Sequence, residues 1–285
     1  IPLSKSVFNY KDLERLTIDL LVSTGVAIDD ADVVKEVLIN AELDGVASHG
    51  LSRLPIYLER LKKGLLNKNP RITTEFLFPA LGIMDADNAL GHIAAYKAMQ
   101  ETITKSKEMG IAAVGVKNSN HFGAASYYLK MAIDEGLIGV VISNGPSAIP
   151  PWGGREPYFG TNPLAIGIPG GNSGPIIIDM ATSVVARGKI IKAAQEGGTL
   201  EEGWALDGEG KPTTDPKAAL EGCILPMALH KGSAIAMAIE ALAGVVTGAG
   251  FGKDVIWQDN DTTGKGNEGH LVVAINPNGF LSVAG

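Results

Sequence analysis

The sequence contains a single cysteine, few aromatic residues and no long apolar run. Because Cys223 is the one cysteine among 285 residues, no disulfide forms within the chain, and this usage suits a reducing compartment. No apolar stretch reaches the roughly 20 residues that span a bilayer, and the N-terminus lacks a charged-then-apolar signal pattern. We therefore expect a cytoplasmic protein without membrane contact.

Basic residues are also scarce, with 24 Lys and Arg against 31 Asp and Glu and a formal net charge of -7. Because these basic residues form no cluster, binding to a nucleic acid is not expected. Hydrophobic residues make up 45% of the chain, which is enough for the core of one large domain or two moderate ones.

The first part of the chain has helical patterns. Two segments within residues 10–43 carry apolar residues at three-to-four spacing, and Asp29 and Asp30 are candidate caps for the second segment. Pro55 suits the first turn of a further helix. We expect a helical N-terminal domain over residues 1–80.

From about residue 82, short β-branched runs alternate with helical patterns, which is typical of α/β layering. The runs "PLAIGIP" and "PIIIDMA" are joined through "GGNSG", which is too short for a crossover helix, so these strands should be antiparallel within a mixed sheet. The polar stretch from 195 to 222 should run over the surface, before a long small-residue helix and a last strand. Residues 81–285 are expected to form an α/β domain.

One glycine pattern is similar to a phosphate-binding loop. The segment "GKGNEG" at 264–269 has G-x-G-x-x-G spacing, but it precedes a strand instead of linking a strand to a helix. It therefore lacks the helix N-terminus whose backbone amides bind phosphate. We interpret it as a turn, and a Rossmann fold is not predicted.

Three polar residues in turns are candidates for chemistry. His49 follows the end of a helical segment, Arg53 comes four positions later, and His121 follows the strand "IAAVGVK". Loops at strand ends commonly carry the sites of α/β proteins. Each histidine has a plainer alternative, in which backbone groups or solvent satisfy the ring.

Two charged residues stand at the ends of elements. Asp179 follows three isoleucines, and a carboxylate buried there needs a cation, an imidazole or backbone amides, unless it caps the helical segment "SVVARGK". Lys231 opens the last helix, where a cation opposes the helix dipole unless an anion such as a cofactor phosphate binds. A solvated helix end is the alternative for Lys231.

The sequence lacks the motifs of two classes of enzyme. His49, His121 and Asp179 are ligand types that suit a metal, but no H-x-x-x-H or C-x-x-C pair accompanies them, so no metal is expected. No G-x-S-x-G motif indicates a serine hydrolase.

Six motifs occur in one order over most of the chain: "DGVASHGLSRLPIYLERL", "VGVKNSNHFGAASYY", "FGTNPLAIGIP", "IIIDMATS", "GKPTTDPKAAL" and "LHKGSAIAMAIEALAGVVTGA". Together they closely resemble the malate/L-lactate dehydrogenase family that is distinct from the Rossmann-fold lactate and malate dehydrogenases. This family includes ureidoglycolate and sulfolactate dehydrogenases, 2,3-diketogulonate reductase and Δ1-piperideine-2-carboxylate reductase. The resemblance implies a homodimeric NAD(P)-dependent oxidoreductase with a three-layer α/β fold and a mixed, largely antiparallel sheet.

The resemblance also implies roles for individual residues. His49 and Arg53 would face a small carboxylic acid substrate, beside Ser48 and Asn120, and His121 is the second active-site histidine. Cofactor contacts are implied for Thr161, Asn162, Pro163, Asp179, Met180, Ala181, Thr182, His230 and Lys231.

The implied chemistry needs a proton and a fixed cation. Hydride transfer to C2 of a 2-oxo acid leaves an alkoxide, which an imidazole that titrates near neutrality can protonate. We hypothesise that His49 is this acid, oriented or stabilised by Asp179, with His121 as the rival proton donor. Arg53 would hold the substrate carboxylate through a two-pronged ion pair.

Several alternatives stay open. The cofactor is NAD or NADP. Two other substrates are alternatives to a malate- or lactate-type acid. The segments "DPKAALEG" and "HKGSA" favour the cyclic imine Δ1-piperideine-2-carboxylate, and "PPWGG" and "ILPM" favour 2,3-diketogulonate. A catalytically inactive nucleotide-binding protein is the alternative of another class. Against the family pattern, the chain stops before a C-terminal segment that contributes to the cofactor site, and a glycine-rich insertion before Lys231 is absent, which puts the role of His230 in question.

Overall fold

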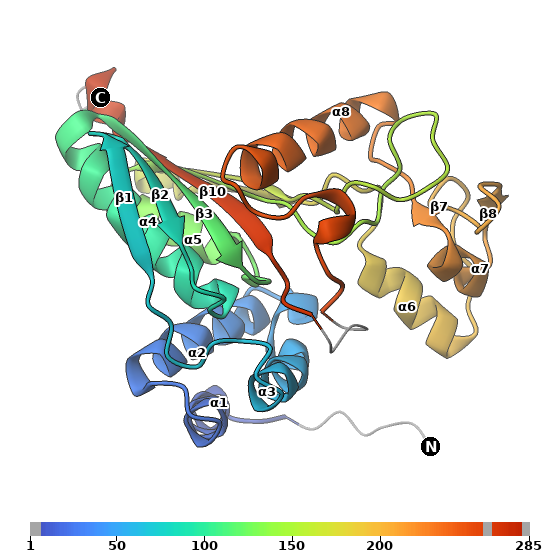
Figure 1. The fold of residues 1–285 in the computed structure, drawn as a ribbon, viewed down its shortest axis with the longest axis horizontal. Helices are drawn as coiled ribbons and strands as arrows, with labels where there is room; N and C mark the ends of the chain where they lie inside the picture. The colour runs from blue at the N-terminus through green and yellow to red at the C-terminus, as the bar shows by residue number, and fades with distance from the viewer. Residues whose placement is uncertain (1–6, 259–263, 281–285) are drawn as a thin grey trace.

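The computed structural model describes residues 7–258 and 264–280 (Figure 1). Its helices are α1 (Tyr10–Ser23), α2 (Ile28–Leu43), α3 (Leu54–Lys62), α4 (Gly91–Met109), α5 (Ser126–Asp134), α6 (Arg187–Glu196), α7 (Pro216–Glu221) and α8 (His230–Ile239). Its strands are β1 (Thr73–Phe78), β2 (Leu81–Asp85), β3 (Ile111–Ser119), β4 (Ile138–Ser143), β5 (Leu164–Ile168), β6 (Ile176–Met180), β7 (Ala205–Leu206), β8 (Pro212–Thr213), β9 (Cys223–Ile224) and β10 (Glu268–Ile275).

Helices α1 to α3 form an N-terminal helical layer. Their apolar stripes pack on one another around a core that includes Leu21, Val34, Leu38, Tyr57 and Leu61. Pro55 lies in the first turn of α3, as predicted. The predicted capping by Asp29 or Asp30 is wrong, because Ala27 is the N-cap of α2 and both aspartates lie in its first turn.

Seven strands form the main sheet in the order β1-β2-β3-β10-β4-β5-β6. Strands β2 and β3 are parallel, and the other neighbouring pairs are antiparallel, which confirms the predicted mixed, largely antiparallel sheet. Strands β5 and β6 pair directly, with Leu164 opposite Met180, as their short connection requires. Strand β1 belongs to this sheet, so the helical part ends before Thr73 instead of at residue 80.

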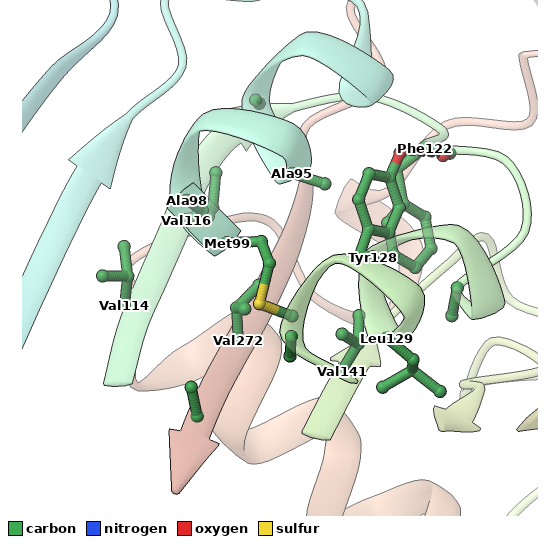
Figure 2. Close-up of a cluster of buried hydrophobic side chains, with 14 of the residues drawn as sticks. Ala95, Ala98, Met99, Val114, Val116, Phe122, Tyr128, Leu129, Val141 and Val272 are labelled. Carbon is green, nitrogen blue, oxygen red and sulfur yellow. Dashed lines mark hydrogen bonds between the residues drawn. The ribbon is translucent and has the colours of Figure 1, made fainter. Parts of the chain in front are cut away.

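Helices cover both faces of the main sheet. On one face, Val141 and Val272 pack with Met99 of α4 and with α5 (Figure 2). On the other face, Ile142 of β4 packs against Ile239 of α8 and the segment that follows it. Neighbouring residues of β4 thus serve opposite faces, because side chains alternate along a strand. The predicted three-layer arrangement is confirmed.

Two regions differ from the sequence prediction. Strands β7 and β8, within the polar stretch from 195 to 222 for which no strand was predicted, form a second, three-stranded sheet with β9, which directly follows that stretch. This small sheet has its own apolar cluster, in which Ala205 and Ile224 pack with Phe159 and Ile190. The long last helix is also not uniform, since α8 continues into the π-helical segment η4 (Glu240–Val245), a feature that is frequent at functional sites.

The glycine pattern at 264–269 leads into β10, so the strand-to-helix geometry of a dinucleotide-binding loop is not formed there, as predicted. Within the described ranges, each helix is too short or too polar to cross a membrane.

Candidate active site

The imidazole rings of His49 and His121 stack with their centroids 5.5 Å apart and 26° between their planes. His49 ends the 3-10 turn η1 (Ala47–His49), which follows α2, and His121 lies in the loop between β3 and α5. The hydroxyl of the exposed Ser48 lies 3.0 Å from Nδ1 of His49. The fold therefore brings together the two histidines that the sequence singled out.

Arg53 is the charged neighbour of both rings. It ends the 3-10 turn η2 (Leu51–Arg53) and is the N-cap of α3, at the helix entrance where the sequence predicted it. Burial lowers the pKa of His49, and the guanidinium of Arg53 lowers it further. Burial and then Arg53 also hold the pKa of His121 well below its ordinary value. The site thus pairs a permanent cation with imidazoles that favour their neutral form.

Tyr57 is a site residue that the sequence patterns did not reveal. Its side chain is buried, its hydroxyl lies 2.7 Å from Nδ1 of His121, and its ring meets His92 edge-on at 5.0 Å. Tyr57 follows Arg53 by four positions, as Arg53 follows His49. This spacing is the signal that could have found it, since residues four apart on a helix share a face.

The side chain of Asn120 holds the loop that carries His121 in place through hydrogen bonds. Its side chain is buried and donates to Oδ1 of Asn88 at 3.1 Å and to the carbonyl of Ala89 at 2.8 Å. Its Oδ1 accepts from the backbone N–H of Gly266 at 3.1 Å. Both amide hydrogens and the oxygen are engaged within the protein, so this geometry does not support the implied substrate contact.

The same loop is fixed from the sheet side. Phe122 stacks on His270 at 4.7 Å and on Tyr128 at 5.4 Å. The two nitrogens of His270 lie 2.8 Å from the hydroxyls of Ser143 and Ser119. Burial lowers the pKa of His270 to about 4, so this ring is neutral near pH 7 and acts as a structural group.

Asp179, near the end of β6, caps helix α5 from a separate strand. Its Oδ2 accepts from the backbone N–H of Ser126 at 2.9 Å. Burial raises the pKa of this carboxyl, and hydrogen bonds from the amides of Ser126 and Ala125 oppose that rise. The predicted pairing with backbone amides is confirmed, whereas a cap on the next helix is wrong because α6 begins only at Arg187. No imidazole is bonded to Asp179 in the described part of the chain.

Asn162 is turned into the protein. Its amide donates to the carbonyl of Ala236 at 2.9 Å and to Oε2 of Glu240 at 2.7 Å, and its Oδ1 accepts from the N–H of Gly145 at 3.2 Å. The backbone of Asn162 has the unusual φ of 26°. Because both amide hydrogens are engaged within the protein, the side chain of Asn162 has no N–H left to donate to a cofactor.

Glu240 is the buried anchor of this network. Its Oε1 accepts from the amide of Asn144 at 3.3 Å and from the N–H of Gly252 at 2.7 Å, while Oε2 accepts from Asn162. Glu240 is 3% exposed and begins the π-helical segment η4. The sequence signal was present, since this residue is the one charge within the small-residue run "AIAMAIEALAGVV".

The "GTNP" and "DMAT" motifs lie side by side. The backbone N–H of Thr182 donates to the carbonyl of Thr161 at 2.8 Å, and its hydroxyl donates to the same carbonyl at 3.0 Å. Thr182 is buried, Thr161, Pro163 and Ala181 are half-buried, and Met180 is exposed. Of these implied cofactor positions, Thr182 has a structural role through its side chain.

His230 and Lys231 are exposed at the N-terminus of α8, where the sequence predicted a helix start. The ring of His230 meets Trp152 at 6.2 Å. An exposed cation at the positive end of a helix fits an anionic group such as the phosphate of a nucleotide cofactor.

Known proteins resemble this chain over nearly all of its length. The family model described as malate/L-lactate dehydrogenase matches residues 8–285. L-sulfolactate dehydrogenase of Methanothermobacter thermautotrophicus is 44% identical over 259 residues, which cover 91% of this chain and 75% of the relative. The NAD(+)-dependent ureidoglycolate dehydrogenase of Escherichia coli K12 is 38% identical over 270 residues, which cover 95% and 77%.

Solved structures agree with the sequence relatives. The sulfolactate dehydrogenase structure from Methanocaldococcus jannaschii has a TM-score of 0.91 at 40% identity and covers 97% of this chain and 79% of that one. The Δ1-piperideine-2-carboxylate reductase structure from Pseudomonas syringae pvar. tomato has a TM-score of 0.90 at 33% identity and covers 96% and 83%. The chain therefore belongs to the malate/L-lactate dehydrogenase family and is an oxidoreductase of the dehydrogenase type that uses a nicotinamide cofactor.

Proposed function

We propose that the protein transfers hydride between a nicotinamide cofactor and a small 2-hydroxy or 2-oxo acid of the malate/L-lactate type. The observation that carries this proposal is the cation of Arg53 beside the stacked rings of His49 and His121. A 2-oxo acid presents a carboxylate and a carbonyl oxygen on adjacent carbons, and these groups need a cation and a hydrogen-bond donor close together. Relatives named sulfolactate dehydrogenase add 2-hydroxy acids with a second acidic group to the substrates to be tested.

The residues of the chain have separable tasks in this reaction. A bound nicotinamide supplies or accepts the hydride at C2. Arg53 holds the substrate carboxylate and thereby fixes the orientation of C2. His49 or His121 gives a proton to the alkoxide oxygen during reduction, and the neutral imidazole takes a proton from the hydroxyl during oxidation.

Asp179 has a positioning role in this proposal. Its carboxylate binds the first amide of α5, and this helix directly follows the loop of His121. The earlier hypothesis of an Asp179–His49 pair is therefore replaced by an indirect effect, in which Asp179 fixes the end of the loop.

Residues at two element ends are proposed to hold the cofactor. Lys231 and His230 at the start of α8 suit its phosphates, and Thr161, Pro163, Met180 and Ala181 lie on the adjoining "GTNP" and "DMAT" segments. Relatives with NADP(+) and with NAD(+) in their names both match the chain, so the assay includes both cofactors.

We also propose that the protein is a homodimer in the cytoplasm. Exposed apolar side chains line the edge strand β6, with Ile176 56% and Ile178 41% exposed. An unpaired apolar edge strand favours burial against another chain. The single, buried Cys223 suits a reducing compartment.

A second candidate is reduction of the cyclic imine Δ1-piperideine-2-carboxylate. The structural match to a reductase of that name favours it. The carboxylate clamp and the hydride step would be the same, with a C=N bond in place of C=O.

The experiment follows the oxidation of NADH and NADPH by absorbance. Pyruvate, oxaloacetate, sulfopyruvate, 2,3-diketogulonate and Δ1-piperideine-2-carboxylate are compared side by side. Turnover of a 2-oxo acid above that of the imine supports the proposal. Turnover of the imine alone replaces it by the second candidate. Cofactor binding without turnover of any of these substrates contradicts both and favours the catalytically inactive protein.

A further inference from the structure

Two polar groups lie within hydrogen-bonding distance of Nδ1 of His121. The hydroxyl of Tyr57 lies 2.7 Å from it, and the backbone N–H of Gly123 points to it from 3.4 Å. A backbone amide can only donate, so Nδ1 of His121 must be the acceptor and carry a lone pair. The Tyr57 hydroxyl must then be a donor to the same nitrogen.

This pattern determines where the ring proton lies. In a neutral imidazole one nitrogen carries hydrogen and the other accepts, so an accepting Nδ1 requires hydrogen on Nε2. Protonation of Nδ1 would set its N–H against the amide of Gly123, which cannot turn into an acceptor. The contacts therefore select one tautomer and disfavour the imidazolium ion.

The groups around His121 act in the same direction. Burial is the largest cause that lowers the pKa of His121, and the guanidinium of Arg53 from η2 opposes a positive charge on its ring as well. The rings of His49 from η1, His92 from α4 and His270 from β10 add to this effect when they are themselves protonated.

Packing holds the ring of His121 next to the Tyr57 hydroxyl and the amide of Gly123. The ring of His121 stacks with that of His49 at 5.5 Å and with that of Tyr57 at 6.2 Å between centroids, with 26° between planes in each pair. Gly123 has a φ of 79°, and a Cβ there would lie 2.9 Å from Val37 and 3.1 Å from His92. A glycine is thus needed for its N–H to approach the imidazole this closely.

We propose that Tyr57 and the amide of Gly123 hold His121 as a neutral imidazole with its hydrogen on Nε2, and that Tyr57 is a positioning residue of the active site. The part that concerns catalysis rests on the proposed function. There, Nε2–H of His121 donates a hydrogen bond to the C2 oxygen and keeps its proton. During reduction the hydride bonds to C2, the C=O π pair moves to oxygen, and protonated His49 supplies the proton as the nicotinamide is oxidised.

The test is a histidine nitrogen–proton NMR spectrum of the whole protein, with the His121→Gln variant used to assign the signal. We expect a protonated Nε2 and an unprotonated Nδ1 that stay unchanged from about pH 8 to about pH 5. A hydrogen on Nδ1, or titration of His121 near its ordinary pKa, would overturn the proposal. This measurement needs no substrate or cofactor, so its result is independent of the proposed function.

The Tyr57→Phe variant tests the positioning role. The change removes one hydroxyl from a buried ring, and thermal unfolding checks that the fold is kept. We expect His121 to exchange between tautomers and to titrate at higher pH than in the wild type, with kcat lowered about tenfold and the pH profile altered. Tyr96→Phe, which removes a hydroxyl bonded to Gln100 on α4, is the matched control. An unchanged His121 spectrum in Tyr57→Phe would refute the role of Tyr57.

Discussion

The carboxylate of Glu240 accepts a hydrogen bond from the side-chain amide of Asn162 at 2.7 Å, and both residues are buried. Glu240 begins the π-helical segment after α8, while Asn162 lies in the loop before β5. This bond ties the "GTNP" loop to the helix whose first residues are proposed to hold the cofactor. The loop conformation therefore depends on a carboxylate that no ligand is proposed to touch.

Glu240→Ala should be strongly destabilising. The change leaves the donors of Asn144, Asn162 and Gly252 without their acceptor, and each buried unsatisfied group costs about 1–3 kcal/mol. Glu240→Gln keeps one acceptor oxygen and should cost less. Urea unfolding measures both, with the exposed Glu209→Ala as control. Equal stability of Glu240→Ala and the wild type would refute the anchoring role.

Asp179→Asn should separate a capping role from direct catalysis. Asparagine keeps an oxygen that accepts from the amide of Ser126, so α5 should stay capped and kcat should fall less than about threefold. Asp179→Ala removes the acceptor and should lower stability by about 1 kcal/mol. The kcat of both variants is measured beside that of His49→Ala. Loss of turnover in Asp179→Asn at unchanged stability would restore a direct catalytic role.

Stability should fall as the pH drops below the ordinary pKa of histidine. Burial lowers the pKa of His92 to about 3 and that of His270 to about 4 in the folded protein. The unfolded chain therefore binds more protons than the folded one from pH 6.5 downward, and each such histidine removes about 1.4 kcal/mol per pH unit in this window. The stability contributed by each neutral ring is fully present above pH 6.5 and is lost towards its folded pKa.

His92→Leu tests this pH dependence. No hydrogen bond to either ring nitrogen of His92 is formed within the described ranges, so leucine removes a titrating group without removing a bond. The slope of unfolding free energy against pH should become shallower by about 1.4 kcal/mol per unit below pH 6. An unchanged slope in His92→Leu would show that His92 is not the titrating group.

The sequence predicted element types well and side-chain directions poorly. The antiparallel pairing of β5 with β6 followed from a connection too short for a helix, and Pro55 marked the start of α3. Asn120 and Asn162 stand in turns beside the site, yet both amides point into the protein. Residue type and a turn position do not tell which way a side chain points, because that depends on contacts between segments far apart in the chain.

Arg53→Lys should chiefly weaken substrate binding. Lysine keeps the charge but lacks the planar fork that grips a carboxylate with two parallel bonds. We expect the KM of the acid substrate to rise about 10- to 100-fold, while the KM of the nucleotide stays nearly constant. Initial rates at varied substrate and cofactor concentrations measure the two constants. Arg15→Lys, on the exposed side of α1, is the control. An unchanged substrate KM would contradict the carboxylate clamp.

The two directions of the reaction should depend oppositely on pH through His49. Burial and the charge of Arg53 lower the pKa of His49 below 6.5. Reduction requires the protonated ring as donor, so its kcat/KM should fall as the pH rises through that lowered pKa. Oxidation requires the neutral ring, so its kcat/KM should rise through the same pKa and level off above it.

Arg53→Gln removes the charge, so the pH at which the rate changes should move to higher pH in both directions. Arg15→Gln, which removes a charge on the exposed side of α1, should leave that pH unchanged. Rate–pH profiles in both directions measure, for each variant, the pH at which kcat/KM changes. His49→Ala should lose this pH dependence together with most of the turnover. If the residual activity of His49→Ala kept the same pH dependence, a different group would be titrating, and the assignment of proton exchange to His49 would fail.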